Sequence, residues 1–431
     1  MSKKIFIVLT IAVLLITFMN SCQKKGQVNT ENGMTKKDGE IVSLSNPDMT
    51  LLYWSPEVGE DIEKTIALYE KKYGGKVDVQ VAPSFNEYMS KIIAMYSSGQ
   101  SPDWVGLYDW QAMGLMTKGV LGKFTSYVDA DDSDFYLPAM DGIKYKNDYY
   151  GICARPGAAL VYYNKRLFEN AGLKTPLEYW DEGSWSWDTL KELGTQLTIR
   201  QNGNVTQWGY SGYGADYVMR SNDGMYSRFN SDGGIDITIK DERTLKAFRY
   251  MQEMYVGNNA WAQYEAADSD KGFVDGTIAM TGAAAWNAEM NYHGKMSDEF
   301  GIVPFPAGPD VKADSAPGGS NWYVSTVNGA KNPAGAVAFF KISEQISKEK
   351  ELESHPVWNQ EHKDVFTRIK EMTIYSGYPA AVGIDSNILW NPICKQGKPI
   401  SQTIEGVIPT IQKAIDSFLD EGSKISPNSS N

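Results

Sequence analysis

The sequence predicts an α/β protein with two lobes, and three observations lead to this fold class. Its 431 residues, less an N-terminal leader and tether, leave roughly 390 for the folded part, which is more than one hydrophobic core usually serves. Residues 50–110 alternate between the apolar patterns of strands and of helices. Hydrophobic residues make up 42% of the chain and aromatic residues 12%, which is enough to fill two substantial cores.

Residues 1–21 have the pattern of a secretory signal peptide. Two lysines precede an apolar run at residues 5–18, which is shorter than the ~20 residues that a membrane-spanning helix needs. The pair Ser21-Cys22 resembles the end of the lipobox of bacterial lipoproteins, in which the cysteine becomes the lipidated first residue. We therefore expect export and a lipid on Cys22. An incidental thiol beside an ordinary cleavage site is the alternative.

Residues 22–44 are expected to form a flexible tether. Between residues 23 and 40 the chain is polar and shows no hydrophobic period, so it cannot bury enough apolar surface to order itself. The folded part is then expected to begin at residue 45.

Charge and cysteine content exclude several classes of protein. The formal net charge is -12 and the pI is about 4.9, which argues against nucleic acid or an anionic membrane surface as a partner. Beyond Cys22, only Cys153 and Cys394 remain, and their wide separation in sequence favours two isolated thiols over a disulfide framework.

The strongest local pattern is strand, helix, strand, helix, strand, over residues 51–54, 62–73, 77–81, 84–99 and 103–108. Such units close as right-handed parallel crossovers, and open α/β sheets bind ligands outside the carboxyl ends of their strands. This rule points to Trp54, Phe85 and Asp109 with the loops around them. None of these loops has a G-x-G-x-x-G or P-loop pattern, so a phosphate cradle is not expected.

Further along the chain, residues 149–164 are broken by Gly and Pro between apolar strands, and a kinked final helix is expected around Pro409. Residues 208–236 are rich in Gly, Tyr, Asn and Asp, and we expect loops there that carry function.

The sequence lacks the usual components of metal or nucleophilic catalysis. It has three histidines and no C-x-x-C, H-E-x-x-H or G-x-S-x-G motif. A glycosidase, which needs only two carboxylates roughly 5–10 Å apart, remains an open alternative. The acidic run at residues 129–134 lacks the glycine of an EF-hand loop and is interpreted as a charged turn. We expect no cofactor, no metal and no enzymatic activity.

Many aromatic residues stand beside Gly, Asn, Ser or Asp instead of inside apolar periods. These are Trp54, Phe85, Trp110, Trp208, Tyr210, Tyr213, Tyr217, Trp286, Trp322 and Trp390. Sugars present C–H faces between hydroxyl edges, so their sites need flat apolar rings together with Asp, Asn and Arg side chains. Any single one of these residues has a core position as an equal alternative; the grouping with polar neighbours favours a carbohydrate site.

Four passages resemble the family 1 extracellular solute-binding proteins, the sugar-capturing components of ATP-driven (ABC) importers. They are SGQSPDWVGLYD at 98–109, YYGICARPGAALVYYNKRLFENAGL at 149–173, GFVDGTIAMTGAAAW at 272–286 and FGIVPFPAGPDVKADSAPGGSNWYVS at 300–325. The resemblance implies a two-lobed periplasmic-binding-protein-like fold of type II, with a ligand cleft between lobes joined by crossover strands. It implies residues 45–152 and 324–375 in the N-terminal lobe, and 153–323 and 376–431 in the C-terminal lobe.

The resemblance also implies site residues. Asp109 matches the polar residue after the P-D strand, Trp286 the tryptophan after the A-M motif, and Arg155 and Asn321-Trp322 the crossovers. Two looser matches are Tyr213 in a loop of the second lobe and Trp390 late in the chain. With Trp54 and Phe85 from the strand-end rule, the hypothesis is an oligosaccharide stacked on Trp54, Trp286 and Trp322, with Asp109, Arg155 and Asn321 bonding its hydroxyls. An acidic sugar such as a uronate is a variant that Arg155 raises.

The expected protein is a monomeric lipoprotein that is anchored through Cys22 on the extracellular face of the membrane, or in the periplasm of a cell with an outer membrane. It is expected to deliver its sugar to the permease subunits of an ABC importer. A secreted glycosidase or lyase, and a surface adhesin or glycan sensor, are the rival functions.

Overall fold

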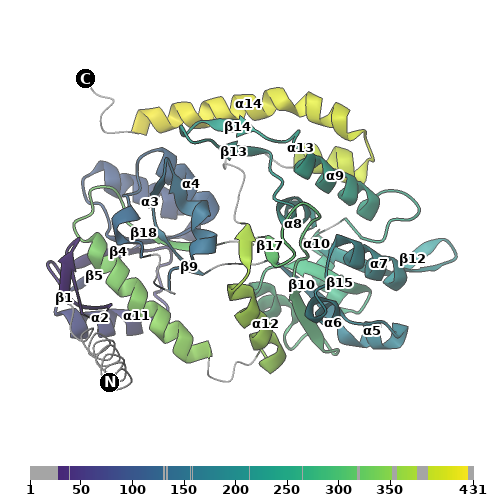
Figure 1. Ribbon diagram of the computed structural model, residues 1–431, viewed down its shortest axis with the longest axis horizontal. Helices are drawn as coiled ribbons and strands as arrows, with labels where there is room; N and C mark the ends of the chain where they lie inside the picture. Colours follow the sequence, from purple (N-terminus) through teal and green to yellow (C-terminus); the bar gives the residue numbers. More distant parts are fainter. Residues whose placement is uncertain are drawn as a thin grey trace, which may run out of the picture.

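The computed structural model describes residues 28–37, 39–129, 132, 134–155, 157, 159–212, 214–264, 266–317, 321–351, 357–375 and 387–425. Figure 1 shows two α/β lobes side by side, each built on its own five-stranded sheet. Among the helices that the structure describes, none combines the length and the apolar character needed to cross a bilayer.

The N-terminal lobe has the strand order β5-β4-β6-β18-β9. Its strands are β4 (Met49–Tyr53), β5 (Val77–Val81), β6 (Trp104–Tyr108), β9 (Ile152–Arg155) and β18 (Trp322–Ser325). Its helices are α2 (Glu60–Tyr73), α3 (Phe85–Ser97), α4 (Asp109–Thr117), η1 (Thr125–Tyr127), η2 (Leu137–Ile143) and α11 (Pro333–Glu351), and β7 (Lys144–Tyr145) and β8 (Asp148–Tyr149) form a hairpin. Strand β4 runs parallel to both β5 and β6, which confirms the predicted alternation of strands and helices.

The C-terminal lobe has the strand order β11-β12-β15-β10-β16. Its sheet strands are β10 (Leu160–Asn164), β11 (Ile199–Gln201), β12 (Asn204–Gly212), β15 (Ile278–Ala283) and β16 (Phe300–Pro304), beside a hairpin of β13 (Ser227–Phe229) and β14 (Ile235–Ile237). Its helices are α5 (Lys165–Ala171), α6 (Pro176–Asp181), α7 (Trp187–Leu197), α8 (Gly214–Ser221), α9 (Glu242–Tyr255), α10 (Ala266–Val274), η3 (Ala288–Tyr292), α12 (Gln360–Lys370), α13 (Asn387–Trp390), η4 (Asn391–Lys395) and α14 (Ile400–Ile425). The loop expected over residues 208–236 is thus wrong in part, because it contains the end of β12, α8 and the β13–β14 hairpin.

The lobes are joined after β9, before β18 and after α11. Next to these junctions, β17 (Ser315–Pro317) pairs in parallel with β19 (Thr373–Tyr375). Helix α14 runs continuously through Pro409 and contacts α9 of the C-terminal lobe and α4 of the N-terminal lobe, as Figure 1 shows along one side of the molecule.

The tether prediction is wrong for residues 28–44. They form a three-stranded antiparallel meander of β1 (Val28–Glu31), β2 (Met34–Lys37) and β3 (Glu40–Leu44). Met34 and Ile41 are only 2% and 5% exposed and belong to the core of the N-terminal lobe, so the meander is stabilised by docking on a core that other segments build. The sequence did contain a hairpin signal, because Asn32-Gly33 adopts the positive φ angles of a tight turn. Cys22 and the signal peptide lie outside the described residues.

The predicted lobe boundary at residue 375 is also wrong. On and just after α12, Val365, Ile369 and Met372 are buried in one cluster with Tyr162 and Ile302 of the C-terminal lobe. Residues 357–372 therefore belong to that lobe, and the chain leaves the N-terminal lobe after α11.

Asp103, in the family-like P-D passage, has a structural role. Its two carboxylate oxygens accept hydrogen bonds from the backbone N–H groups of Thr50 (2.8 Å) and Asn332 (2.6 Å). The carboxylate thus ties the start of β4 to the start of α11. Burial raises the pKa of Asp103 above its ordinary value, and these hydrogen bonds act against that shift.

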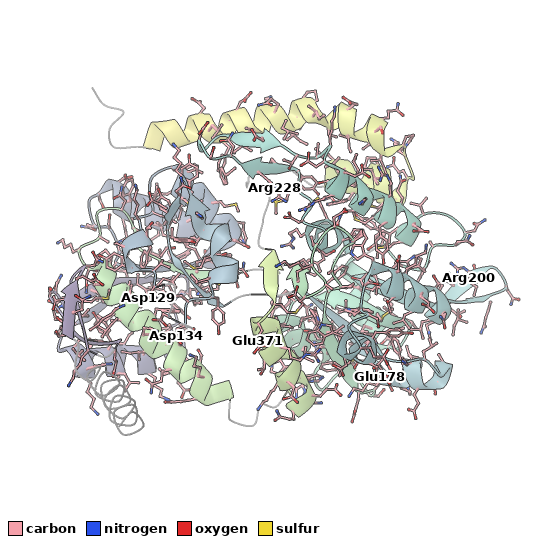
Figure 2. The ribbon with its side chains drawn as sticks, viewed as in Figure 1. Asp129, Asp134, Glu178, Arg200, Arg228 and Glu371 are labelled. Carbon is pink, nitrogen blue, oxygen red and sulfur yellow. The ribbon has the colours of Figure 1, made fainter. Side chains whose placement is uncertain are left out.

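The acidic run at residues 129–134 makes ion pairs with α11. Lys341 contacts both Asp132 and Asp134, and Figure 2 shows Asp129 and Asp134 on the N-terminal lobe. In the described part of the chain, no group of three or more His, Cys, Asp or Glu side chains is arranged to hold a metal ion.

Cys153 and Cys394 are buried free thiols in different lobe cores, as predicted.

Candidate functional site

Aromatic rings line the carboxyl-end edge of the N-terminal sheet. Trp54 follows β4, Tyr108 ends β6, and Trp322 begins β18, which pairs antiparallel with β6. The Trp322 ring lies 4.8 Å from Trp54 and 4.9 Å from Tyr108, centroid to centroid, at interplanar angles of 74° and 77°. These edge-to-face contacts hold the three rings in fixed positions at the place that the strand-end rule predicted.

Two more rings extend this line. Phe85 lies 6.2 Å from Tyr108 and 6.4 Å from Trp110. Phe85 and Trp110 are 37% and 39% exposed, which is high for large apolar side chains. We call these five residues, Trp54, Trp322, Tyr108, Phe85 and Trp110, the aromatic row. Tyr108 was not predicted as a site residue, although it directly precedes Asp109.

Gly106 makes room for the Trp322 ring. A Cβ atom at this position of β6 would come within 2.2 Å of the Trp322 ring. The indole therefore lies directly on the backbone of the neighbouring strand, and its position depends on the missing side chain.

Asp109 begins α4 next to the row and is only 1% exposed. Its carboxylate accepts the backbone N–H of Trp110 at 3.0 Å. Burial raises the pKa of Asp109 to about 7, and the positive charge of Arg220 acts in the opposite direction. Because Arg220 lies on α8, the carboxylate is influenced by a charge from the other lobe.

Arg220 is a site residue that the sequence reasoning missed. It is 2% exposed, and its guanidinium carbon lies 5.3 Å from the centroid of the Tyr217 ring. An arginine inside a segment rich in Gly, Tyr, Asn and Asp was the available signal. A buried arginine is rarely tolerated without polar or anionic neighbours. Arg220 is buried in one lobe and acts electrostatically on Asp109 of the other, which indicates a role at the junction of the lobes.

Asn321 is committed to the junction between the lobes. Its side chain is fully buried, with Oδ1 accepting the N–H of Gly157 (2.8 Å) and Nδ2 donating to the hydroxyl of Tyr323 (3.2 Å). This arrangement corrects the expectation that Asn321 bonds ligand hydroxyls, because its amide instead ties one crossover to the next.

The backbone of Arg155 pairs with that of Trp322 in the sheet, which places β9 at the same edge. Tyr213 lies outside the described residues.

Trp286 belongs to the opposite lobe. It follows β15, whose last residue Ala283 pairs with Leu160, the first residue of β10 after the crossover. The indole is 50% exposed, so it keeps a free face near the junction of the lobes.

Trp390 has no face open to a ligand. It is 3% exposed in the core of the C-terminal lobe and packs against Phe248 (5.5 Å) and Tyr226 (5.8 Å). The prediction that Trp390 contacts the ligand is corrected, because neighbours from distant parts of the sequence cover the ring.

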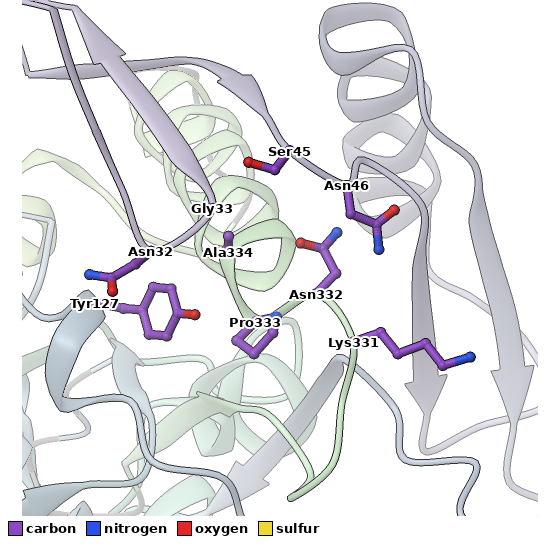
Figure 3. A pocket seen from close by; sticks show the side chains of 9 residues that line it. All are labelled: Asn32, Gly33, Ser45, Asn46, Tyr127, Lys331, Asn332, Pro333 and Ala334. Atoms are coloured by element: carbon purple, nitrogen blue, oxygen red, sulfur yellow. The ribbon is translucent and has the colours of Figure 1, made fainter.

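A polar pocket of about 250 Å³ is lined entirely by the N-terminal lobe (Figure 3). It lies where the meander meets η1 and the start of α11, and its lining includes Asn32, Tyr127 and Asn332. The Asn332 amide is already used, because Nδ2 donates to the carbonyl of Asp48 (3.0 Å) and Oδ1 accepts the N–H of Gly335 (2.7 Å). We assign this pocket to the docking of the meander and not to a ligand.

Two sheets joined by crossovers, with exposed rings at their junction, define the two-lobed periplasmic-binding-protein-like class. The chain belongs to the bacterial extracellular solute-binding protein family, whose family model matches residues 64–351.

Two curated relatives match the chain at low identity. The chain is 26% identical over 230 residues to an arabinooligosaccharide-binding protein of Halalkalibacterium halodurans, which covers 50% of this chain and 47% of that protein. It is 20% identical over 273 residues to a binding protein of Brucella abortus (strain 2308), covering 61% and 63% of the two chains. The match thus spans less than two thirds of the length of these curated relatives.

Solved structures show the same fold over most of the chain. An ABC substrate-binding protein of Listeria monocytogenes in complex with cycloalternan has a TM-score of 0.59 at 21% identity, with 86% of this chain and 98% of that chain covered. The galacto-N-biose-/lacto-N-biose I-binding protein of Bifidobacterium longum has a TM-score of 0.60 at 16% identity, with 86% and 97% covered.

Proposed function

We propose that this protein captures an oligosaccharide between its lobes and delivers it to the permease of an ABC importer. The observation that supports this proposal most directly is the aromatic row, a line of indole, phenol and phenyl rings along the edge where α/β sheets bind ligands. Successive sugar units present successive apolar faces, so a chain of rings suits an oligosaccharide better than a single compact solute.

Both lobes contribute to the proposed site. The aromatic row belongs to the N-terminal lobe and the half-exposed Trp286 to the other lobe, while Asp109 and Arg220, which are 1% and 2% exposed, interact electrostatically across the two lobes. A ligand that touches both sets of residues stabilises the closed arrangement of the lobes, because only that arrangement lets both sets contact it. Such closure supplies both affinity and a shape change that a permease can recognise.

The relatives support the same class of ligand. The Halalkalibacterium halodurans protein is named for arabinooligosaccharide, and the Listeria monocytogenes structure holds cycloalternan. Membership of an extracellular solute-binding family agrees with export, and we propose that a lipid on Cys22 anchors the protein outside the cell. Loss of fatty-acid labelling in a Cys22→Ala variant would test the anchor.

Calorimetry tests the proposed function. Arabinotriose, mannotriose and maltotetraose are titrated into the protein, with glycerophosphocholine as a non-sugar comparison. We expect at least one oligosaccharide to bind with a Kd in the micromolar range or tighter. Trp54→Ala should weaken that binding by about tenfold or more, whereas Trp180→Ala, in α6 of the C-terminal lobe, should not.

Two results would overturn the proposal. One is a lack of binding by all three oligosaccharides, whether or not glycerophosphocholine binds. The other is conversion of the oligosaccharide to shorter products, detected by chromatography of the same mixtures, which would identify a glycosidase or lyase.

A further inference from the structure

The segment that carries Trp286 needs support from outside itself. The half-exposed indole is followed by η3, a π-helix over Ala288–Tyr292, which is closed by the N–H of His293 donating to the carbonyl of Ala288 (2.8 Å). π-Helical turns are rare, and they often occur at functional positions. Trp286 lies two residues before this turn, so contacts that hold the turn also act on the chain next to Trp286.

One carboxylate supplies those contacts. Asp270, on α10, accepts hydrogen bonds from the hydroxyl of Tyr292 (2.5 Å), the Nδ2 of Asn291 (2.8 Å) and the Nδ2 of Asn287 (3.5 Å). All three donors belong to the segment directly after Trp286, and Asn287 is its immediate neighbour. The charged acceptor strengthens each bond relative to a neutral one.

The donors are themselves held in place. Burial raises the pKa of Tyr292 above its ordinary value, and the hydrogen bond to Asp270 acts in the same direction, so the hydroxyl stays protonated and donates. The Tyr292 ring packs edge-on against Tyr162 and Phe273, each at 5.0 Å. On the other side of Trp286, the hydroxyl of Tyr162 lies 2.9 Å from the carbonyl of Ala284. The chain is therefore held in place on both sides of Trp286.

We propose that Asp270 is a positioning residue that sets the Trp286 indole for stacking on the ligand. This inference rests on the proposed function, because it requires Trp286 to touch the sugar. Asp270 itself acts through Asn287, Asn291 and Tyr292 and does not need to reach the ligand.

The first test needs no ligand. Hydrogen exchange is measured in the full chain for Asp270→Asn and for the milder Tyr292→Phe, which keeps the ring and removes only one donor. The matched control is Asp275→Asn, which changes an exposed carboxylate paired with Lys271 at the end of the same helix. We expect exchange at the His293 amide to rise by about tenfold in both variants and to stay unchanged in the control. Unaltered exchange at His293 in both variants would overturn the inference.

The second test separates positioning from general stability. Affinity is measured for the oligosaccharide among arabinotriose, mannotriose and maltotetraose that binds, in wild type, Asp270→Asn, Trp286→Ala and the double variant. We expect Asp270→Asn to weaken binding by about tenfold in the wild-type background and by less than about twofold when Trp286 is absent.

The outcomes distinguish the two proposals. An equal loss in both backgrounds overturns positioning through Trp286 and leaves the proposed function intact. Unchanged affinity in Trp286→Ala removes Trp286 from the site, which overturns this inference but not an oligosaccharide site on the aromatic row. If none of the three oligosaccharides binds, the proposed function fails as stated, and the inference that depends on it falls with it.

Discussion

The hydroxyl of Tyr145, in the N-terminal lobe, donates a hydrogen bond to the carbonyl oxygen of Gly233, in the C-terminal lobe, at 3.1 Å. Tyr145 ends β7, and Gly233 lies in the turn between β13 and β14, so two hairpins from opposite lobes meet. The Phe229 ring packs edge-on against Tyr145 at 5.4 Å. Asn230 shapes the turn by accepting the N–H of Gly234 at 2.8 Å. This contact joins the lobes at a place that is separate from the crossovers.

Tyr145→Phe should therefore shift the protein towards the open arrangement. The ring and its packing remain, but the bond between lobes is lost, and its net value of about 0.5–1.5 kcal/mol corresponds to a two- to tenfold change in the balance of closed and open forms. Small-angle scattering of ligand-free protein should give a larger radius of gyration, and the affinity for sugar should fall by a similar factor. Tyr127→Phe, beside the meander of the same lobe, should change neither quantity. Equal radii for Tyr145→Phe and wild type would contradict this prediction.

Replacement of Asp109 by Asn should change how stability depends on pH. The folded-state pKa of Asp109 is raised by burial from its ordinary value of 3.8 to about 7, so the folded protein holds this proton where the unfolded chain has released it. The free energy of unfolding contributed by Asp109 is thus highest below about pH 4 and is lost as the pH rises towards 7, by at most about 4 kcal/mol. The stability of wild type relative to Asp109→Asn, measured by urea unfolding at several pH values, should fall across this window. A difference that is constant with pH would show that the carboxylate has an ordinary pKa.

Gly106→Ala should displace the Trp322 ring. The new Cβ would come within 2.2 Å of the ring, so either the indole or the strand must shift, which we expect to cost about 1–3 kcal/mol in the free energy of unfolding. Sugar binding should weaken as well. Gly114→Ala, on α4, meets no atom within 4 Å and should be neutral or slightly stabilising, because alanine favours a helix. Thermal unfolding of both variants tests this prediction. Equal melting temperatures would refute the close contact between position 106 and the Trp322 ring.

Asp103→Ala should lower stability without acting on the ligand directly. It leaves the N–H groups of Thr50 and Asn332 without their carboxylate acceptor, which we expect to cost about 2–5 kcal/mol. Asp78→Ala, exposed on the edge strand β5, should change stability by less than about 0.5 kcal/mol. Similar urea midpoints for the two variants would mean that the P-D aspartate does not join β4 to α11.

The regular part of the N-terminal lobe could be predicted from its sequence. Alternation at period two and spacing at three and four residues are local properties, and they identified β4, β5, β6 and the helices between them. Because parallel crossovers bring the carboxyl ends of strands to one edge, Trp54, Phe85 and Asp109 were expected near one another, and the structure places them around the aromatic row.

The surroundings of single residues could not be predicted in the same way. Trp390 and Trp286 both stand beside polar residues in the sequence, yet the first is 3% exposed and the second 50%. Tyr226 and Phe248, more than a hundred residues away in the chain, cover Trp390, and no local pattern records them. The burial of Arg220 escaped prediction for the same reason.

The amino-acid sequence was enough to predict the two-lobed α/β class, the membership of a solute-binding family and the edge of the sheet at which a ligand is expected. The fold class and the edge follow from local periodicity and from the geometry of parallel strands, which neighbouring residues encode, whereas the family was indicated by the resemblance of four passages of the sequence. The folded arrangement was needed to see which rings stay open, that Asn321 ties the crossovers together, and that Arg220 influences Asp109 across the lobes. The burial of a side chain and its distance from charged groups depend on residues that are far apart in the chain. They are therefore established only when the chain folds.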